Sequence, residues 1–302
     1  MSHFVSPGDL LQQPPATSLT HACWLALALL LCLGRNDVAF GRGDDDDEEA
    51  EKPASTVPNL YLDLQTSYTT LPAGALGIGF RNFTSLPTLS SPASQTVTVN
   101  APITVDFNDR ISVYGGVSSS TSRTDTTSWT SLTATSWNVG VQADVIQQNG
   151  GSFPTVTVQS TLSRSIGSSA LATTTFTTLV DFDYALDADE MRGLLAGVRY
   201  VGVTVDSDLA RVNPSIIGYV GGYHQWPDNW KLSGRFGVQS FGGAQILNLT
   251  PIKPFTQPIV RLDLERLDDD DNRLFGLTAE ILWVPKPSYQ LTLRTPLYAI
   301  RN

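Results

Sequence analysis

The stretch WNVGVQADVIQQNGG, residues 137–151, decides the fold class, because apolar residues alternate with polar or small ones along its first nine positions. Successive side chains of a β-strand point to opposite faces of the sheet, so this alternation predicts a strand with one apolar face. The strand runs into Gln148–Gly151, where asparagine and glycine favour a tight turn. The stretch therefore predicts a strand followed by a reversal of the chain.

The same period of two recurs from about residue 58 to about residue 300, and no helical period appears. Nearly every segment has one apolar face and one face of Asp, Arg, Glu, Gln, Thr and small residues. We expect twelve strands, at residues 60–69, 94–107, 110–119, 134–148, 153–165, 172–184, 192–205, 213–225, 230–242, 257–267, 273–284 and 288–300.

The links between these segments alternate in length. Short links rich in turn residues follow the even-numbered segments, at 108–109, 148–151, 187–191, 227–229 and 268–272. Longer links follow most odd-numbered segments, at 70–93, 120–133, 206–212 and 243–256, although the links after Arg164 and at Pro285–Pro287 are shorter. Aromatic residues stand at the ends of the apolar rows: Trp137, Tyr184, Trp230, Trp283 and Tyr289. Short turns on one side, longer loops on the other and aromatic girdles are typical of outer-membrane barrels.

The pattern predicts an all-β fold, a twelve-stranded antiparallel up-and-down transmembrane β-barrel with both termini on the short-turn, periplasmic side. Closure leaves no sheet edge with unpaired backbone groups, which lipid could not satisfy. Apolar rows then face lipid and polar rows face the lumen. We expect Pro102 and Pro296 to interrupt strand pairing, because proline lacks the backbone N–H. The alternative is a secreted soluble β-sandwich, whose strands alternate in the same way.

The N-terminal part predicts an export signal. The apolar run Ala22–Leu33 is too short to span a bilayer, which needs about 20 residues. Small residues follow it near Gly41, as at a signal-peptide cleavage site, although a buried helix is the alternative interpretation. We expect residues 1–41 to be a signal peptide, residues 42–57 an acidic disordered linker and residues 58–302 the barrel.

Composition disfavours several classes of protein. The net charge of −10 argues against a nucleic-acid partner, which usually meets a basic face. The two cysteines, Cys23 and Cys32, both lie in the predicted signal peptide, and the chain has three histidines. Disulfide scaffolds, zinc enzymes and Ser-His hydrolases are therefore disfavoured. We expect no enzyme activity, no catalytic residues, no cofactor and no metal.

Two hairpins resemble a known family. Ser136–Pro154 with the following Thr-Val-Thr-Val-Gln-Ser, and the turn Asp106–Val113, are similar to putative outer-membrane proteins of the MetA-pathway phenol-degradation type. The resemblance extends over about residues 58–302. It implies a twelve-stranded barrel and the passage of small compounds, aromatic or otherwise hydrophobic ones among them. The family supplies no catalytic residues.

Charged residues at lumen-facing positions are the candidate site. They are Asp144, Asp181, Asp183, Arg199, Lys231, Arg235, Arg261, Asp263, Glu265, Glu280 and Arg294. They could line a selective polar path. They could equally pair across neighbouring strands and fill the interior. The sequence leaves both interpretations open.

Other candidates have simpler interpretations. By parity we expect His224 to point inward with Gly222 and Trp226, as a lumen or turn residue rather than a general base. Asp268–Asp271 suits a solvated turn better than a cation site. The triplets at Asn82 and Asn248 match the glycosylation pattern, which has little information.

The sequence therefore predicts a protein of the cell outer membrane, exported by its signal peptide, that acts as a channel or facilitator for small solutes. Its expected partners are outer-membrane lipid, a small-molecule solute and the barrel-assembly machinery. A plugged barrel with a structural or adhesive role, through Ser/Thr-rich loops such as 117–134, is the alternative.

Overall fold

The computed structural model describes residues 58–73, 93–148, 151–166, 172–208, 210–246, 251–269, 272–283 and 287–300. These belong to the compact unit Pro53–Asn302. The predicted signal peptide, the whole predicted acidic linker, Asn82, Asn248 and part of Asp268–Asp271 lie outside the described residues. Among the described residues, no helix is long and apolar enough to cross a membrane.

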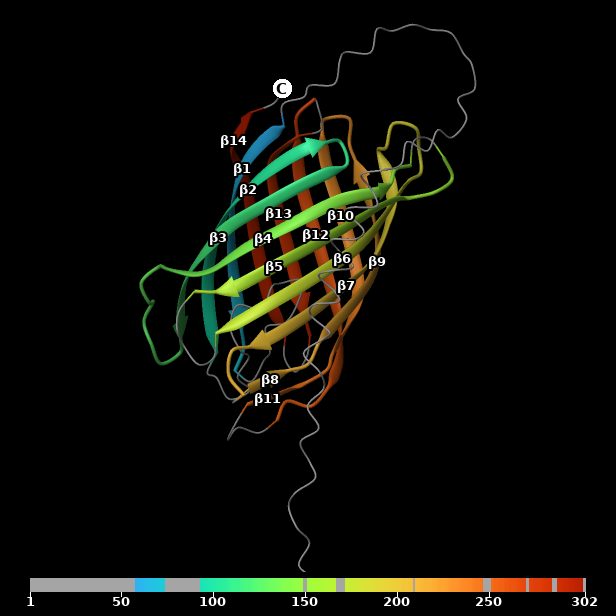
Figure 1. The fold of residues 1–302 in the computed structure, drawn as a ribbon. Coiled ribbons are helices and arrows are strands. Elements are labelled where there is room, and N and C mark those ends of the chain that lie inside the picture. Colours follow the sequence, from blue (N-terminus) through green and yellow to red (C-terminus); the bar gives the residue numbers. More distant parts are fainter. Residues whose placement is uncertain are drawn as a thin grey trace, which may run out of the picture. The chain divides into compact units, whose positions relative to one another are not determined.

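Twelve antiparallel strands form one closed barrel (Figure 1), as the alternation predicts. The order around the barrel is β1-β14-β13-β12-β10-β9-β7-β6-β5-β4-β3-β2. The strands are β1 (Asn59–Leu71), β2 (Ser94–Asn108), β3 (Ile111–Thr124), β4 (Thr133–Ile146), β5 (Thr155–Ser165), β6 (Thr173–Ala185), β7 (Arg192–Val205), β9 (Ser215–Gln225), β10 (Trp230–Phe241), β12 (Phe255–Leu267), β13 (Arg273–Leu282) and β14 (Ser288–Ile300).

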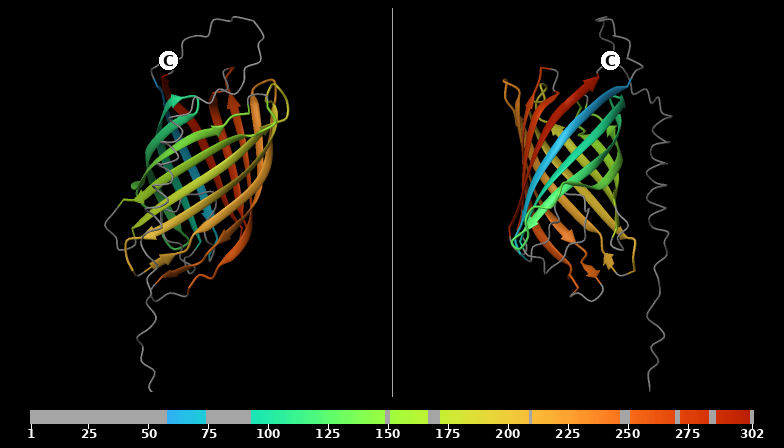
Figure 2. Two further views of the ribbon diagram at one scale, coloured as in Figure 1. Left: turned by 45° about the vertical axis from the view of Figure 1, so that its right-hand side comes forward. Right: turned by 90° about the vertical axis from the view of Figure 1, so that its left-hand side faces the viewer.

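The first and last strands close the sheet. β1 pairs antiparallel with β14 from Leu60↔Ile300 to Thr70↔Tyr289. The two strands lie side by side in both views of Figure 2. Closure removes the free edges that an open sheet would expose. The single closed layer rules out the soluble β-sandwich, whose apolar rows would have to meet across two stacked sheets.

The two prolines interrupt the ladder as predicted. β1 pairs with β14 at Leu62↔Tyr298 and then at Asp63↔Pro296, so Leu297 is bulged out of register. On the other side of β1, pairing with β2 stops at Leu62↔Ile103 and resumes at Gln65↔Asn100, which leaves Pro102 unpaired there. Both gaps follow from the missing backbone donor of proline.

The sequence did not predict a small second sheet. β8 (Ala210–Val212) and β11 (Ala244–Ile246) pair with each other inside the two connections that flank β9 and β10. Their apolar residues join a buried cluster of Val201, Val212, Phe241, Ala244 and Ile252. Gly243, directly before β11, has a φ of +88°, a conformation that glycine adopts without strain. This sheet extends the barrel at its long-loop end.

The two ends of the barrel differ. Short connections at 109–110, 147–154, 186–191, 226–229 and 268–272 share one end with the start of β1 and the end of β14. The connections 72–93, 125–132, 166–172, 206–214, 242–254 and 283–287 share the other end. Longer loops mark the extracellular end of such barrels. We call the end with the short connections the periplasmic end and the end with the longer loops the outer end.

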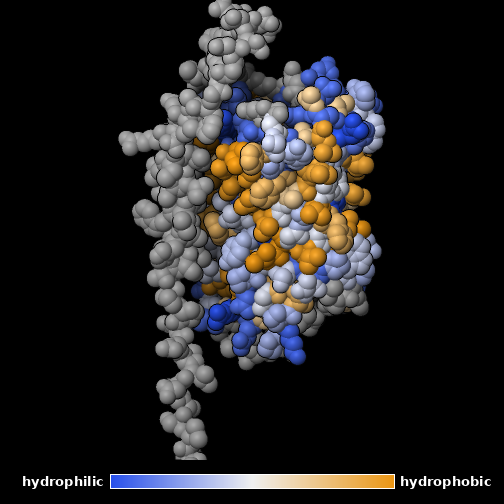
Figure 3. Space-filling view, turned by 90° about the vertical axis from the view of Figure 1, so that its right-hand side faces the viewer, coloured by the Kyte–Doolittle hydropathy of each residue, from blue (hydrophilic) through white to orange (hydrophobic). Residues whose placement is uncertain are grey.

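The outer wall of the barrel is apolar. Large hydrophobic side chains on this wall are exposed, among them Val220, Phe236 and Leu262, each at least half exposed. Figure 3 shows hydrophobic residues gathered over the middle of the barrel wall, with hydrophilic residues toward the ends. A band of this kind would be unfavourable in water and is what lipid requires.

Candidate functional site in the barrel lumen

A cavity of about 500 Å³ lies inside the barrel, and residues from all twelve strands of the barrel line it. Two walls of different chemistry face each other across it. The first is cationic and consists of Arg199, Arg235, Arg261, Arg273 and Arg294 from β7, β10, β12, β13 and β14. The second is neutral and polar, from β2 to β5: Asn100, Thr104, Ser112, Tyr114, Asn138, Gln142, Gln159 and Thr161.

The cationic wall is held together by Asp263. The register places Arg235 of β10 directly opposite Arg261 of β12, and like charges in such a pair repel. Asp263 faces inward two residues after Arg261 on β12. Its carboxylate accepts hydrogen bonds from both guanidinium groups, at 2.6 Å from Arg235 and 2.8 Å from Arg261. The Thr278 hydroxyl also donates to it. One buried carboxylate therefore offsets two arginines.

The remaining arginines differ in their partners. Arg273 pairs with Glu265 at 2.7 Å. Glu280 is buried in the wall, close enough to attract Arg199 and Arg261. Arg294 makes no ion pair with any described residue, and its buried Nε has no hydrogen-bond partner there. Arg294 is thus a cation of this wall that lacks an ion-pair partner among the described residues, with Asp263 and Glu265 as the carboxylates that attract it from a distance.

Tyrosine rings lie against glycines on the inner wall. A Cβ atom added at Gly197 would stand 2.5 Å from the Tyr219 ring, and one at Gly193 would stand 2.2 Å from the Tyr223 ring. Tyr114 covers Gly140 in the same way, and its hydroxyl hydrogen-bonds to that of Thr161. Because glycine has no side chain, each ring can lie flat on the neighbouring strand instead of filling the lumen.

The predicted lumen residues lie in three places: on the cavity lining, buried in its wall, or outside the lining. Asp181, Arg199, Arg235, Arg261 and Arg294 line the cavity. Asp263 and Glu280 are buried in its wall.

Asp144 and Lys231 lie outside the lining of this cavity. The Asp144 carboxylate accepts from the Thr157 hydroxyl at 2.7 Å, and the Lys231 ammonium stands 4.1 Å from the Tyr223 ring centroid. Sequence reasoning missed Arg273, because a register shift between Arg266 and Leu267 opposite the start of β13 breaks the count of two. It also missed the tyrosines, although glycines at inward positions were a usable signal.

The inward side chains nearer the outer end are packed. Ile217, Ile259 and Leu282 form a fully buried cluster directly beyond the arginines. Next to it Gln257 donates to Gln239 at 2.7 Å, and Gln239 donates to Ser215 at 2.9 Å. The cavity therefore lies at the middle of the barrel and toward the periplasmic end, and this packed layer narrows the lumen on its outer side.

His224 points outward, which corrects the prediction that it faces the lumen. On β9 the buried inward residues are the odd ones, Ser215, Ile217, Tyr219 and Tyr223. The Tyr223 ring must face inward to cover Gly193, so its neighbour His224 is exposed on the outer wall. There it contacts Trp226 edge to face, with ring centroids 4.9 Å apart. It lies near the periplasmic turn 226–229. Within the described part of the chain, no three His, Cys, Asp or Glu side chains gather as a metal site.

Comparisons with known proteins support the fold. No protein-family model and no curated protein matches the chain. Among solved structures, the COG4313 outer membrane channel from Pseudomonas putida F1 matches with a TM-score of 0.53 and 9% identity, over 84% of this chain and 100% of that one. The translocator domain of the autotransporter NalP from Neisseria meningitidis has a TM-score of 0.44 and 13% identity, over 95% and 98%. The closed barrel, its apolar outer wall and the shared fold place this chain in the outer membrane.

Proposed function

We propose that this barrel is a passive outer-membrane channel for small solutes, rather than an enzyme. The observation that supports it is the polar cavity of about 500 Å³ lined by all twelve strands. The finer assignment to the MetA-pathway phenol-degradation type rests on the hairpin motifs at Ser136–Pro154 and Asp106–Val113. Export by residues 1–41, a disordered linker at 42–57 and insertion by the barrel-assembly machinery belong to the same proposal.

The lining favours small aromatic carboxylates such as benzoate. Guanidinium groups form strong, geometrically matched hydrogen bonds with carboxylates, and Arg294 has no carboxylate partner among the described residues. Tyr114 and Tyr219, which line the same cavity, offer ring faces and edges to an aromatic ring. Such a solute satisfies both features, whereas a plain hydrocarbon would offer no carboxylate to Arg294.

The packed outer layer supports a second candidate function, a plugged barrel with a structural role. Gln239 and Gln257 are almost fully buried at the outer side of the cavity, next to Ile217 and Ile259. A channel would need this layer to leave a continuous path for solute. A plug would not.

Single-channel recording in planar bilayers separates the two. We expect discrete current steps from the folded protein, with chloride current reduced by added benzoate. Arg294→Gln should keep the steps and weaken the benzoate effect about tenfold, the loss expected for one charged hydrogen bond of about 1.5 kcal/mol. Arg110→Gln, in an exposed periplasmic turn, is the matched control and should leave both unchanged. Folded protein that gives no current steps would contradict the channel and support the plug.

A further inference from the structure

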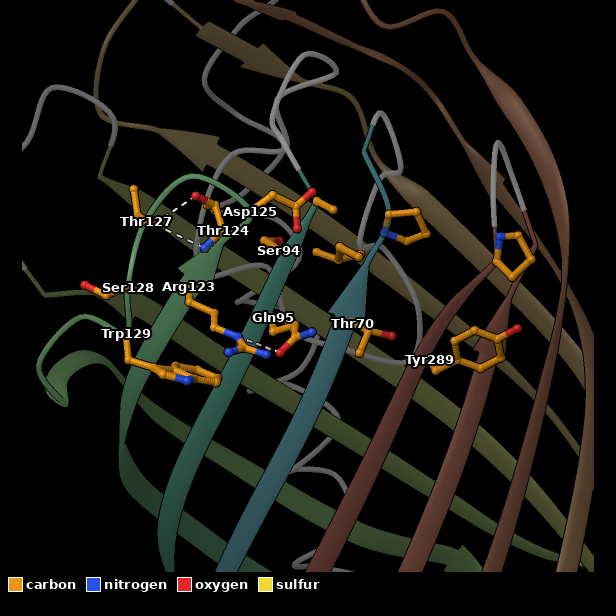
Figure 4. Close-up of a pocket in the computed structure, with 14 residues that line it drawn as sticks. Thr70, Ser94, Gln95, Arg123, Thr124, Asp125, Thr127, Ser128, Trp129 and Tyr289 are labelled. Atoms are coloured by element: carbon orange, nitrogen blue, oxygen red, sulfur yellow. Dashed lines mark hydrogen bonds between the residues drawn. The ribbon is translucent and has the colours of Figure 1, made fainter.

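A second cavity, of about 590 Å³, lies at the outer end of the barrel over β1, β2, β3 and β14 (Figure 4). Its floor is a row of residues in register on four adjacent strands: Arg123 pairs with Gln95, Gln95 with Thr70, and Thr70 with Tyr289. Because paired residues point to the same face, the row lies on one side of the wall. Tyr289 is 53% exposed, so that side is the outer one.

The row sits just above the lipid-facing surface. Two residues along each strand toward the middle of the barrel wall, the same outer face holds Val97, Tyr68 and Leu291, which are again paired in register. Tyr68 and Leu291 are exposed apolar side chains of the outer band. The cavity is thus at the boundary where the apolar wall ends and the outer loops begin. In a membrane, lipid headgroups occupy this level.

Arg123 provides the positive charge of the cavity and is held in place. Its Nε donates to Gln95 Oε1 at 2.8 Å, and its guanidinium lies 5.2 Å from the centroid of the Trp129 ring. Among the described residues, Arg123 makes no ion pair. Its Nη groups remain available to an anion that enters the cavity, and phosphate suits the planar guanidinium best.

The loop that completes the cavity is preformed. The Thr130 N–H donates to the Ser122 carbonyl of β3 at 2.9 Å, and the Thr130 hydroxyl accepts from the Ser122 N–H at 3.0 Å. This fixes the adjacent Trp129 beside Arg123. Asp125 and Ser128, which also line the cavity, are groups that can accept hydrogen bonds from sugar hydroxyls.

We propose that this cavity binds the headgroup of a phosphorylated glycolipid of the outer leaflet. Arg123 binds the phosphate, Asp125 and Ser128 contact sugar hydroxyls, and Trp129 and Tyr289 contact the apolar parts at the membrane interface. The acyl chains extend over Val97, Tyr68 and Leu291. Inner-leaflet phospholipid and free phosphate are the other sources of the same anion, and the test separates them.

Native mass spectrometry of the folded protein in detergent tests the proposal, with diphosphoryl lipid A as the probe. We expect one lipid A to bind, and Arg123→Gln to weaken binding at least tenfold. Arg110→Gln, an exposed arginine at the opposite end, is the matched control and should bind as the unaltered protein does. Fully dephosphorylated lipid A should bind at least tenfold more weakly than the diphosphoryl form.

Three results would overturn the proposal. They are equal binding of phosphatidylethanolamine and lipid A, displacement of lipid A by millimolar inorganic phosphate, and unchanged lipid A binding by Arg123→Gln. Heat-modifiable migration on gels verifies that each variant is folded. Where Arg123→Gln fails this check, Trp129→Ala replaces it, because the loop residue Trp129 is outside the barrel strands, and unchanged lipid A binding by that variant likewise contradicts the proposal.

Discussion

Asp263 is the residue on which the cationic wall depends. We expect Asp263→Asn to destabilise the folded barrel by about 3–5 kcal/mol, because two partly buried guanidinium groups would face each other without their shared, buried carboxylate. Urea unfolding from lipid vesicles measures this change. Asp187→Asn is the control, since Asp187 pairs with Arg192 at an exposed turn. Equal stability of Asp263→Asn and the unaltered protein would show that the wall does not need this carboxylate.

Gly197 is a second residue with a sharp requirement. We expect Gly197→Ala to displace the Tyr219 ring, because the new Cβ would stand 2.5 Å from it. Overpacking of this kind typically costs about 1–3 kcal/mol. Gly218→Ala is the matched control, since its Cβ would meet nothing within 4 Å. The same urea titration compares them, and a Gly197→Ala variant no less stable than Gly218→Ala would contradict the expectation.

At the scale of the strands, closure between β1 and β14 can be tested directly. With Cys23→Ser and Cys32→Ser as the background, paired cysteines at Thr66 and Leu293, which are partners in register, report only on that seam. We expect Thr66→Cys with Leu293→Cys to form a disulfide on oxidation, seen as a reductant-sensitive shift in gel migration. Thr66→Cys with Val139→Cys, on distant strands, should form none. A cross-link absent from the first pair would show that the seam is open.

The strands were the part that the sequence predicts best. Apolar alternation places eleven of the twelve barrel strands within about two residues at both ends, since lipid outside and polar groups inside enforce a period of two. β8 and β11 escape prediction because three residues are too few to show any period.

Individual contacts were much less predictable. The register shift between Arg273 and Phe275 changes which side of β13 Arg273 faces, and the position of Tyr223 over Gly193 sets the face of His224. The pairing of Asp263 with two arginines depends on the register between β10 and β12. None of these can be read from alternation alone.

At the scale of the whole molecule, the stability of the barrel in a membrane depends on contact between its apolar outer wall and the hydrocarbon of the bilayer. Val220 is 63% exposed near the middle of β9, and Leu194 is 54% exposed near the periplasmic end of β7. An arginine at the bilayer midplane costs about 2–4 kcal/mol, whereas one near the interface costs about 0–1 kcal/mol. We therefore expect Val220→Arg to destabilise the barrel in lipid vesicles far more than Leu194→Arg. Urea unfolding in vesicles measures both. If the two variants lose the same stability, the wall does not cross a bilayer at the depth that this fold implies.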